Sequence, residues 1–162
     1  MDVEIKDISL DDVLTQCISL IAPQAEVHQV KIINNISSKR YAVKADYTRL
    51  KQVMLNLLSN AIKYGNDNSL VILENEIIHD KYIHIRVTDI GKGLTSEEIA
   101  KLFTSFARLN TESGIEGTGL GLVITKHMIE LMGGKIGIES ELGKGSTFWI
   151  EIPLSEIESN IL

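Results

Sequence analysis

Residues 56–65, NLLSNAIKYG, lie in a run whose apolar residues recur with the spacing of a buried amphipathic helix. Four polar side chains interrupt that run at steps of three and four residues: Asn56, Asn60, Lys63 and Tyr64. Such steps place side chains on one face of a helix. This face is either an ordinary solvated surface or one wall of a binding site, and the rest of the chain decides between the two.

The composition is that of a globular domain, with 162 residues of which 44% are hydrophobic and 23% charged. A net charge of −6 argues against a nucleic-acid-binding surface. The single cysteine, Cys17, excludes an internal disulfide, and we expect it to pack as a small apolar residue on a helix. No apolar window reaches the roughly 20 residues of a transmembrane helix, and the chain opens without a signal peptide. We therefore expect a cytoplasmic domain, or the cytoplasmic part of a membrane-bound sensor.

Hydrophobic periodicity and end signals predict the elements. Ser9 can cap a first helix that ends before Pro23, and Asp46 can cap the helix that contains residues 56–64. Helices are expected at 9–22, 47–64, 96–102 and 119–132, and strands at 30–36, 41–45, 69–78, 81–90, 135–140 and 146–153. This order favours an α+β fold, a two-layer α/β sandwich with a mixed, mostly antiparallel sheet and about three main helices on one face. We expect one domain, residues 1–155, and a short tail, 156–162.

Asp89 ends a strand, YIHIRVTD, in which Ile83, Ile85 and Val87 share the buried face. Its position has the parity of that buried set, where a carboxylate is costly unless a donor meets it. Gly91 and Gly93 follow and leave space where side chains would stand. Asp89 is thus either the acceptor for the exocyclic amine of a purine or a cap for the next turn.

A glycine-rich loop, GTGLGL at 117–122, comes directly before the last predicted helix. Free backbone N–H groups and the positive end of a helix suit a phosphate chain, although such a loop is often only a tight turn. The spacing differs from the dinucleotide fingerprint, and the chain has no Walker A sequence. On the helix of residues 47–64, an amide oxygen together with triphosphate oxygens would suit Mg²⁺, while Lys63 and Tyr64 could meet a phosphate and a base.

In this order the segments resemble the nucleotide-binding catalytic domain of sensor histidine kinases, a Bergerat-fold group related to gyrase, the large heat-shock chaperone and mismatch-repair ATPases. The resemblance covers almost the whole chain. It is carried by residues 46–65 (the N box), 89–94 (G1 box), 102–109 (F box), 117–122 (G2 box) and 143–153 (the last glycine box and strand).

The resemblance implies ATP and Mg²⁺ as cofactors and assigns a role to each matched residue. Asn60, with Asn56 beside it, would bind the metal; Asn60, Lys63 and Arg108 would be catalytic. Asp89 would accept the adenine amine, Tyr64 would stack on the base, and Thr147 would support the adenine site near Asp89. Phe103 and Phe106 would anchor an ATP lid spanning about 107–117. The implied nucleotide contacts are Asn56, Asn60, Lys63, Tyr64, Asp89, Gly91, Gly93, Leu94, Phe106, Gly117, Thr118, Gly119, Leu120, Gly121 and Thr147.

The chain departs from the family's usual pattern in two places, the G1 box and the lid. Ile90 stands where asparagine is common, Lys92 stands where a small or apolar residue is common, and the predicted lid is short. Members that hydrolyse ATP carry a glutamate at the position of Asn56, and an amide cannot take up a proton. Transfer of phosphate to a histidine therefore fits better than hydrolysis.

None of the four histidines, His28, His79, His84 and His127, has the helical context of a phosphoacceptor. We therefore expect a catalytic module of a larger kinase, whose partners are a phosphoacceptor histidine domain (a dimeric helical hairpin) and a downstream response regulator. Nucleic acid and direct membrane contact are not expected. Two alternatives stay open, an anti-sigma-type serine protein kinase and a non-catalytic nucleotide-binding scaffold.

Overall fold

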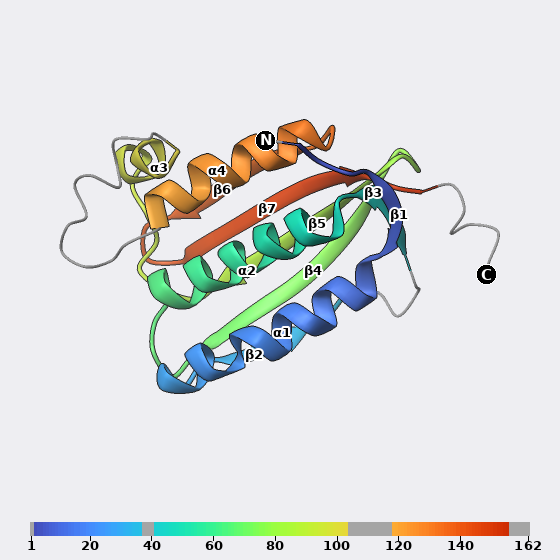
Figure 1. Cartoon of the computed structure of the whole chain (residues 1–162). Coiled ribbons are helices and arrows are strands. Elements are labelled where there is room, and N and C mark those ends of the chain that lie inside the picture. The colour runs from blue at the N-terminus through green and yellow to red at the C-terminus, as the bar shows by residue number, and fades with distance from the viewer. Residues whose placement is uncertain (1, 37–40, 104–117, 156–162) are drawn as a thin grey trace.

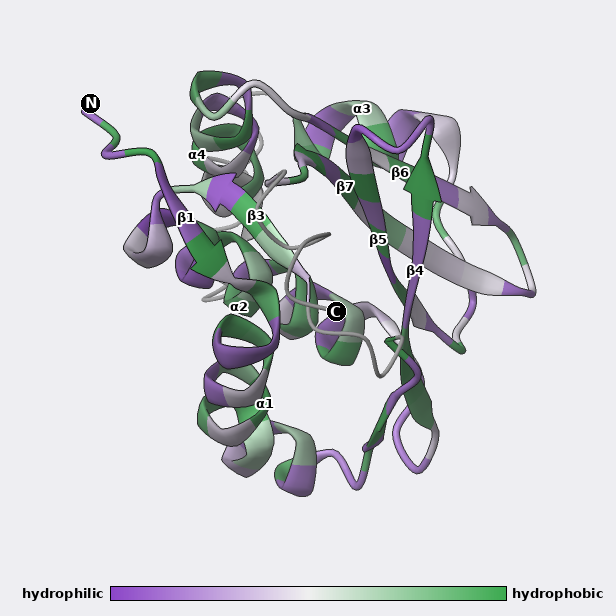
Figure 2. Ribbon diagram, turned by 90° about the vertical axis from the view of Figure 1, so that its right-hand side faces the viewer, coloured by the Kyte–Doolittle hydropathy of each residue, from purple (hydrophilic) through white to green (hydrophobic). Residues whose placement is uncertain are grey.

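The computed structural model of the chain describes residues 2–36, 41–103 and 118–155, except for the side chains of 118–120. Helices α1 (Leu10–Val27), α2 (Tyr47–Tyr64) and α4 (Thr118–Leu131) lie on one face of a five-stranded sheet, and the short helix α3 (Ser96–Leu102) lies beside the start of α4 (Figure 1). Figure 2, turned by 90°, separates the helical layer from the sheet. The predicted α+β two-layer arrangement is confirmed.

The sheet is mixed but mostly antiparallel, as expected. Its strand order is β2-β4-β5-β7-β6, and only β2 and β4 run parallel. A second sheet consists of β1 and β3, paired antiparallel. The strands are β1 (Lys6–Ser9), β2 (Lys31–Asn34), β3 (Ala42–Ala45), β4 (Leu70–Ile78), β5 (Tyr82–Asp89), β6 (Lys135–Glu141) and β7 (Gly145–Pro153).

The core lies between α2 and the inner face of the sheet. The predicted apolar stripe of α2 is at most 1% exposed at every position: Leu50, Val53, Met54, Leu57, Leu58, Ala61 and Ile62. Alternation along β5 and β7 supplies the other half of the core, including Ile85 and Phe148. Cys17 is fully buried on α1, as expected, and its burial raises the pKa of its thiol to about 11. No helix among the described residues is long and apolar enough to cross a membrane.

The first helix is longer than the sequence predicted. We expected it to end before Pro23, but α1 continues to Val27 with this proline inside it. Proline removes one N–H donor, whose acceptor in a regular helix would be the carbonyl of Ser19. Pro23 and Ser19 are both exposed, whereas Ile21 and Ala25 pack into the core. The missing hydrogen bond therefore falls on the solvent side, where water replaces it, and buried contacts hold the last turn.

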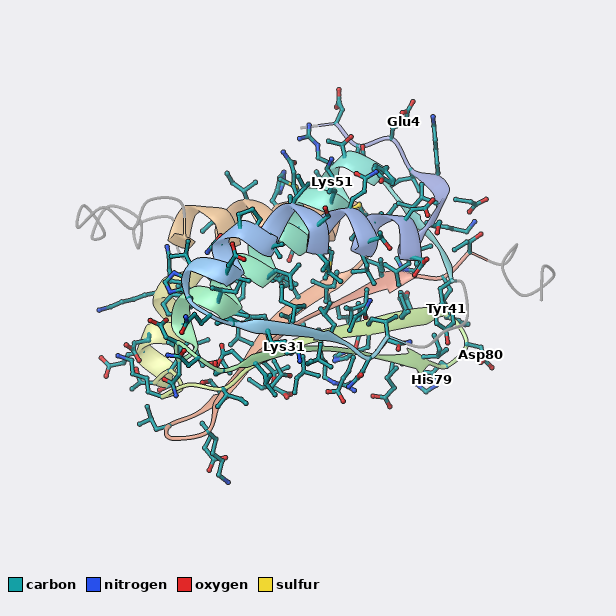
Figure 3. All side chains as sticks on the ribbon, turned by 90° about the horizontal axis from the view of Figure 1, so that it is seen from below. Glu4, Lys31, Tyr41, Lys51, His79 and Asp80 are labelled. Atoms are coloured by element: carbon teal, nitrogen blue, oxygen red, sulfur yellow. The ribbon has the colours of Figure 1, made fainter. Side chains whose placement is uncertain are left out.

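Strand β1 was not predicted, because its partner strand lies far along the chain. It pairs with β3 in the register Lys6↔Ala45 to Ser9↔Ala42, and Val43 in turn bridges to Leu154. These contacts lie at the end of the molecule where the β4–β5 turn, His79 and Asp80, also lies (Figure 3). Asp89 ends β5 at the opposite end of the sheet, seven residues after Tyr82 begins it.

Candidate functional site

Asp89 is a buried carboxylate with only one of its two oxygens hydrogen-bonded among the described residues. Its side chain is at the end of β5 and is 1% exposed. Oδ1 accepts a hydrogen bond from the backbone N–H of Ser146 at 3.1 Å, whereas Oδ2 has no partner among the described residues. Burial raises the pKa of Asp89 to about 6, and the Ser146 N–H opposes that rise. An acceptor oriented in this way requires a donor from outside the described protein.

Glycines surround this carboxylate and let the backbone approach it. A Cβ on Gly91 would lie 3.3 Å from Oδ1 of Asp89 and 2.8 Å from the carbonyl oxygen of Tyr64. A Cβ on Gly145 would lie 2.3 Å from the backbone oxygen of Asp89, and Gly145 has φ +101°. Gly93, with φ +79°, packs in the same way against the backbone of Glu141. A side chain at Gly91 or Gly145 would therefore collide with Asp89 or with the backbone next to it.

The end of α2 is joined to this part of the sheet. Gly65 and Gly91 form an isolated antiparallel bridge, and the N–H of Asn66 donates to the carbonyl of Ile90 at 2.7 Å. Asn60 lies in the turn just before, is 2% exposed, and its Nδ2 has no partner among the described residues. Two unpartnered buried polar groups, on Asn60 and Asp89, thus belong to segments that the structure joins directly.

Asn56, one turn earlier, takes part in helix packing. Its Nδ2 donates to Oγ1 of Thr125 on α4 at 2.8 Å. A Cβ on Gly121 would lie 2.7 Å from both Oδ1 and Nδ2 of Asn56, so this glycine allows α4 to approach α2 closely. Gly121 lies in the first turn of α4, and the predicted contacts of Gly121 and Asn56 with nucleotide therefore compete with this helix contact.

The remaining members of the predicted face lie in the last turn of α2. Lys63 and Tyr64 are both half-buried, and the backbone of Tyr64 contacts the G1 segment at Gly91. Leu94 ends that segment, is 5% exposed and donates its N–H to Oγ of Ser140 at 2.7 Å. The predicted N-box and G1-box residues are therefore brought together at one end of the sheet.

Thr147 requires a correction. Its hydroxyl lies 3.1 Å from that of Thr88, and both residues are on the outer face of the sheet, opposite to Asp89. Ser146, one residue earlier, is 3% exposed and provides the N–H that binds Asp89. Strand alternation explains the error, because Ser146 has the parity of the buried Phe148 while Thr147 has the parity of the outward Trp149.

Several predicted contacts lie outside the described residues. These are Phe106, Arg108, Gly117 and the lid at 107–117. Thr118, Gly119 and Leu120 form the start of α4, but their side chains are not described. Phe103 is half-buried and caps the C-terminal end of α3.

The two unusual G1 residues point away from the interior. Ile90 is 44% exposed, and Lys92 is exposed while its carbonyl accepts the N–H of Gly143 at 2.7 Å. The described residues contain no group of three or more His, Cys, Asp or Glu side chains that could hold a metal ion. A metal at this site would therefore be bound by amide oxygens and by oxygens of its ligand.

The four histidines lie where the sequence placed them. His28 follows α1 and pairs with Asp67 at 2.9 Å, His79 is in the β4–β5 turn, and His127 is exposed on α4. His84, on the outer face of the sheet, stacks on Trp149 with ring centroids 4.9 Å apart. None of the four lies beside Asp89 in the register of the sheet or on α2.

Comparison with known proteins gives a consistent result. The family model of histidine kinase-, DNA gyrase B-, and HSP90-like ATPases matches residues 45–156. Sensor protein GacS of Pseudomonas syringae pv. syringae is 38% identical over 152 residues, which cover 90% of this chain and 17% of GacS. This chain thus spans about a sixth of the length of that relative.

Solved structures agree with this match. The full-length ShkA structure in complex with AMPPNP superposes with a TM-score of 0.81 at 30% identity, covering 96% of this chain and 32% of that chain. The catalytic domain of histidine kinase ThkA gives a TM-score of 0.81 at 27% identity, covering 96% of this chain and 99% of that one. ThkA in complex with the response regulator protein TrrA also matches, with a TM-score of 0.77 at 26% identity over 94% of this chain and 42% of that chain.

Proposed function

The chain belongs to the family of histidine kinase-, DNA gyrase B-, and HSP90-like ATPases as an ATP-binding catalytic domain of the sensor-kinase type, and on that premise we propose that it donates the γ-phosphate of Mg·ATP to a histidine on a separate domain. We further propose that residues 1–155 form the functional unit. The acceptor domain, a dimeric helical hairpin, and a response regulator that receives the phosphate next are proposed as partners.

The observation that carries this proposal is the unpartnered Oδ2 of Asp89. It is a buried acceptor beside the closely packed glycines Gly91 and Gly145, on a segment joined through Gly65 to the turn that bears Asn60. An exocyclic amine of adenine would supply the donor that Oδ2 lacks. With the base held there, the triphosphate would extend toward the amide-bearing face of α2.

The metal would be held by Asn60, with Asn56 as a second candidate. The buried amide of Asn60 fits this role because its Nδ2 has no partner among the described residues and the amide can turn to present its oxygen. Bound Mg²⁺ would neutralise charge on the phosphates during transfer. Asn56 is the weaker candidate, because its amide nitrogen already donates to Thr125.

The reaction class follows from the same residue. An asparagine amide cannot abstract a proton from water, and this one is held by Thr125, so Asn56 does not supply the base that hydrolysis needs. A neutral imidazole is a nucleophile without such a base. Its nitrogen would form a bond to the γ-phosphorus while the bond to the bridging oxygen breaks and ADP leaves. The domain's task is then to position the nucleotide and stabilise its charge.

Calorimetric titration of the domain with Mg·ATP tests binding. We expect saturable binding that Asp89→Asn weakens about a hundredfold, because Asn would present an amide where the base donates. Asp67→Asn, on an exposed aspartate paired with His28, is the matched control and should bind like the unmodified domain. Equal ATP affinity in all three proteins would reject Asp89 as the base-recognition residue.

Transfer is tested by mixing the domain with a phosphoacceptor hairpin and labelled ATP. We expect an acid-labile phosphohistidine on the hairpin, little ATP hydrolysis by the domain alone, and loss of transfer in Asn60→Ala while ADP binding partly survives. An acid-stable phosphoserine would indicate the serine-kinase class, and robust hydrolysis by the pure domain would contradict the role given to Asn56.

A further inference from the structure

The hydroxyl of Ser140 connects the two segments that flank Asp89. Ser140 lies on β6, one residue before its end. Its Oγ is 2.7 Å from the backbone nitrogen of Leu94, 3.0 Å from the carbonyl oxygen of Gly145 and 2.7 Å from Oγ of Ser146. Leu94 belongs to the segment that follows Asp89 in the chain, whereas Gly145 and Ser146 belong to the strand beside it.

A hydroxyl has one proton to donate and two lone pairs to accept with. One arrangement satisfies all three contacts of Ser140. It accepts from the N–H of Leu94, accepts from the hydroxyl of Ser146 and donates to the carbonyl of Gly145. The hydrogen-bonding capacity of this side chain is then full, and removing it would leave three polar groups in a partly buried region without that partner.

These contacts fix the donor that Asp89 uses. Ser146 supplies the only hydrogen bond to Asp89 Oδ1 that the described residues form, and Gly145 packs against the backbone oxygen of Asp89. A small rotation of the Gly145–Ser146 peptide would move that N–H away from the carboxylate. Ser140 holds this peptide through Gly145 and holds the opposite segment through Leu94.

We propose that Ser140 is a positioning residue for base recognition: it keeps the Ser146 N–H on Oδ1 of Asp89 and so leaves Oδ2 directed at an amine-bearing purine. This inference rests on the proposed function. No charged side chain of the described residues forms an ion pair with Asp89, whose close neighbours are Gly65, Gly91, Gly145 and Ser146. The ionised carboxylate therefore depends on that N–H, and a lost or lengthened hydrogen bond raises its pKa.

The test is an NMR titration of the Asp89 side-chain carboxyl carbon in the folded domain. We expect Ser140→Ala to raise the pH at which Asp89 ionises by about one unit. At pH 6.5 the ionised fraction of Asp89 then falls about threefold, and ATP binding should weaken by about the same factor. Ser140→Thr keeps the hydroxyl and should restore both values. Ser59→Ala is the matched control, because it removes a partly buried hydroxyl that bonds Gln24 between α1 and α2, and it should leave Asp89 unchanged.

The outcomes separate this inference from the proposed function. The carboxyl titration needs no nucleotide, so an unchanged Asp89 midpoint in folded Ser140→Ala overturns the inference even if ATP binds as proposed. A domain that binds no ATP but shows the shifted midpoint contradicts base recognition and leaves the hydrogen-bond link intact. If Ser140→Ala does not fold, Ser140→Cys keeps the side-chain volume with weaker hydrogen bonds and should shift the midpoint by about half a unit; no shift there overturns the inference as well.

Discussion

Asp46 and Asp89 stand at opposite ends of the molecule and show how an aspartate that caps a helix differs from one that we propose binds a base. Oδ1 of Asp46 accepts the N–H of Arg49 at 3.0 Å and Oδ2 accepts the N–H of Glu4 at 2.8 Å. Desolvation acts to raise the pKa of Asp46, but these backbone donors and the charge of Arg49 outweigh it and lower the pKa. Asp89 has one donor for two oxygens, and its pKa is raised.

The count of donors separates the two roles. Asp46 starts α2 and ties the N-terminal segment to it, and its own N–H contacts the sulfur of Met132 at 3.3 Å. Asp89 has no second donor among the described residues, and the N-cap of the next helix, α3, is Thr95 and not Asp89. The alternative in which Asp89 caps the following turn is therefore wrong. The Asp46 carboxylate has both oxygens hydrogen-bonded within the protein, whereas Asp89 keeps one acceptor oxygen without a partner among the described residues.

The largest test of this comparison is the pH dependence of stability. Because the pKa of Asp89 is about 6 in the folded domain and that of an ordinary aspartate is 3.8, the native state holds a proton that the unfolded state has released between these two pH values. Stability contributed by this group is therefore full below about pH 4, falls as pH rises toward 6, and the loss reaches about 3 kcal/mol above that. We expect Asp89→Asn to remove this loss and to make the domain more stable at pH 7.5 while it binds ATP poorly. Urea unfolding across pH 4–8 measures the unfolding free energy of both proteins. If that free energy depends on pH in the same way in both, the pKa of Asp89 is not raised in the folded domain.

A second test adds a side chain at Gly145, next to Asp89. Gly145→Ala introduces a Cβ 2.3 Å from the Asp89 backbone oxygen at φ +101°, and we expect it to cost about 3 kcal/mol of unfolding free energy. Gly143→Ala is the matched control, since Gly143 has φ +86° but no atom within 4 Å of the added Cβ, and about 1 kcal/mol is expected. Equal losses in thermal or urea unfolding would show that backbone conformation alone, and not close packing on Asp89, requires the glycine.

The smallest effect is expected at the opposite end. Asp46→Ala removes an N-cap and should cost about 1–2 kcal/mol, while ATP affinity stays within about twofold because the site is distant. Since the pKa of Asp46 is lowered, its contribution to stability is present at neutral pH and is lost as pH falls below the ordinary aspartate value of 3.8. Asp46→Asn keeps an accepting oxygen and should recover most of the loss. A large drop in ATP affinity for Asp46→Ala would show that the two ends are coupled.

The sequence was sufficient wherever a local pattern determined the outcome. The apolar stripe of α2, the inward parity of Asp89 and the helix from Thr118 follow from spacing alone, and all three are present in the structure. Pro23 misled the prediction of the end of α1, because the local signal carried no information on the buried contacts that continue the helix.

Long-range pairing accounts for the rest. Strand β1 forms only by pairing with β3, which lies far along the chain, and the residues of β1 themselves carry no pattern that predicts this pairing. The choice of Thr147 over Ser146 was avoidable, since the alternation of Phe148, Ile150 and Ile152 already assigns Ser146 to the inner face. Ser140 could not be identified in this way, because its contacts depend on how the β6–β7 hairpin meets the G1 segment.

The small β1–β3 sheet has a practical consequence. Leu154, just after β7, bridges Val43 of β3 and donates its N–H to the carbonyl of Lys81, so β3 connects β1 to the end of β7 at one end of the molecule. That end is roughly 23 Å along β5 from Asp89, at about 3.3 Å per residue. A biotin attached beside β1 would tether the domain to a surface with the Asp89 end facing solution, which makes the β1 end a suitable anchoring point for a nucleotide biosensor.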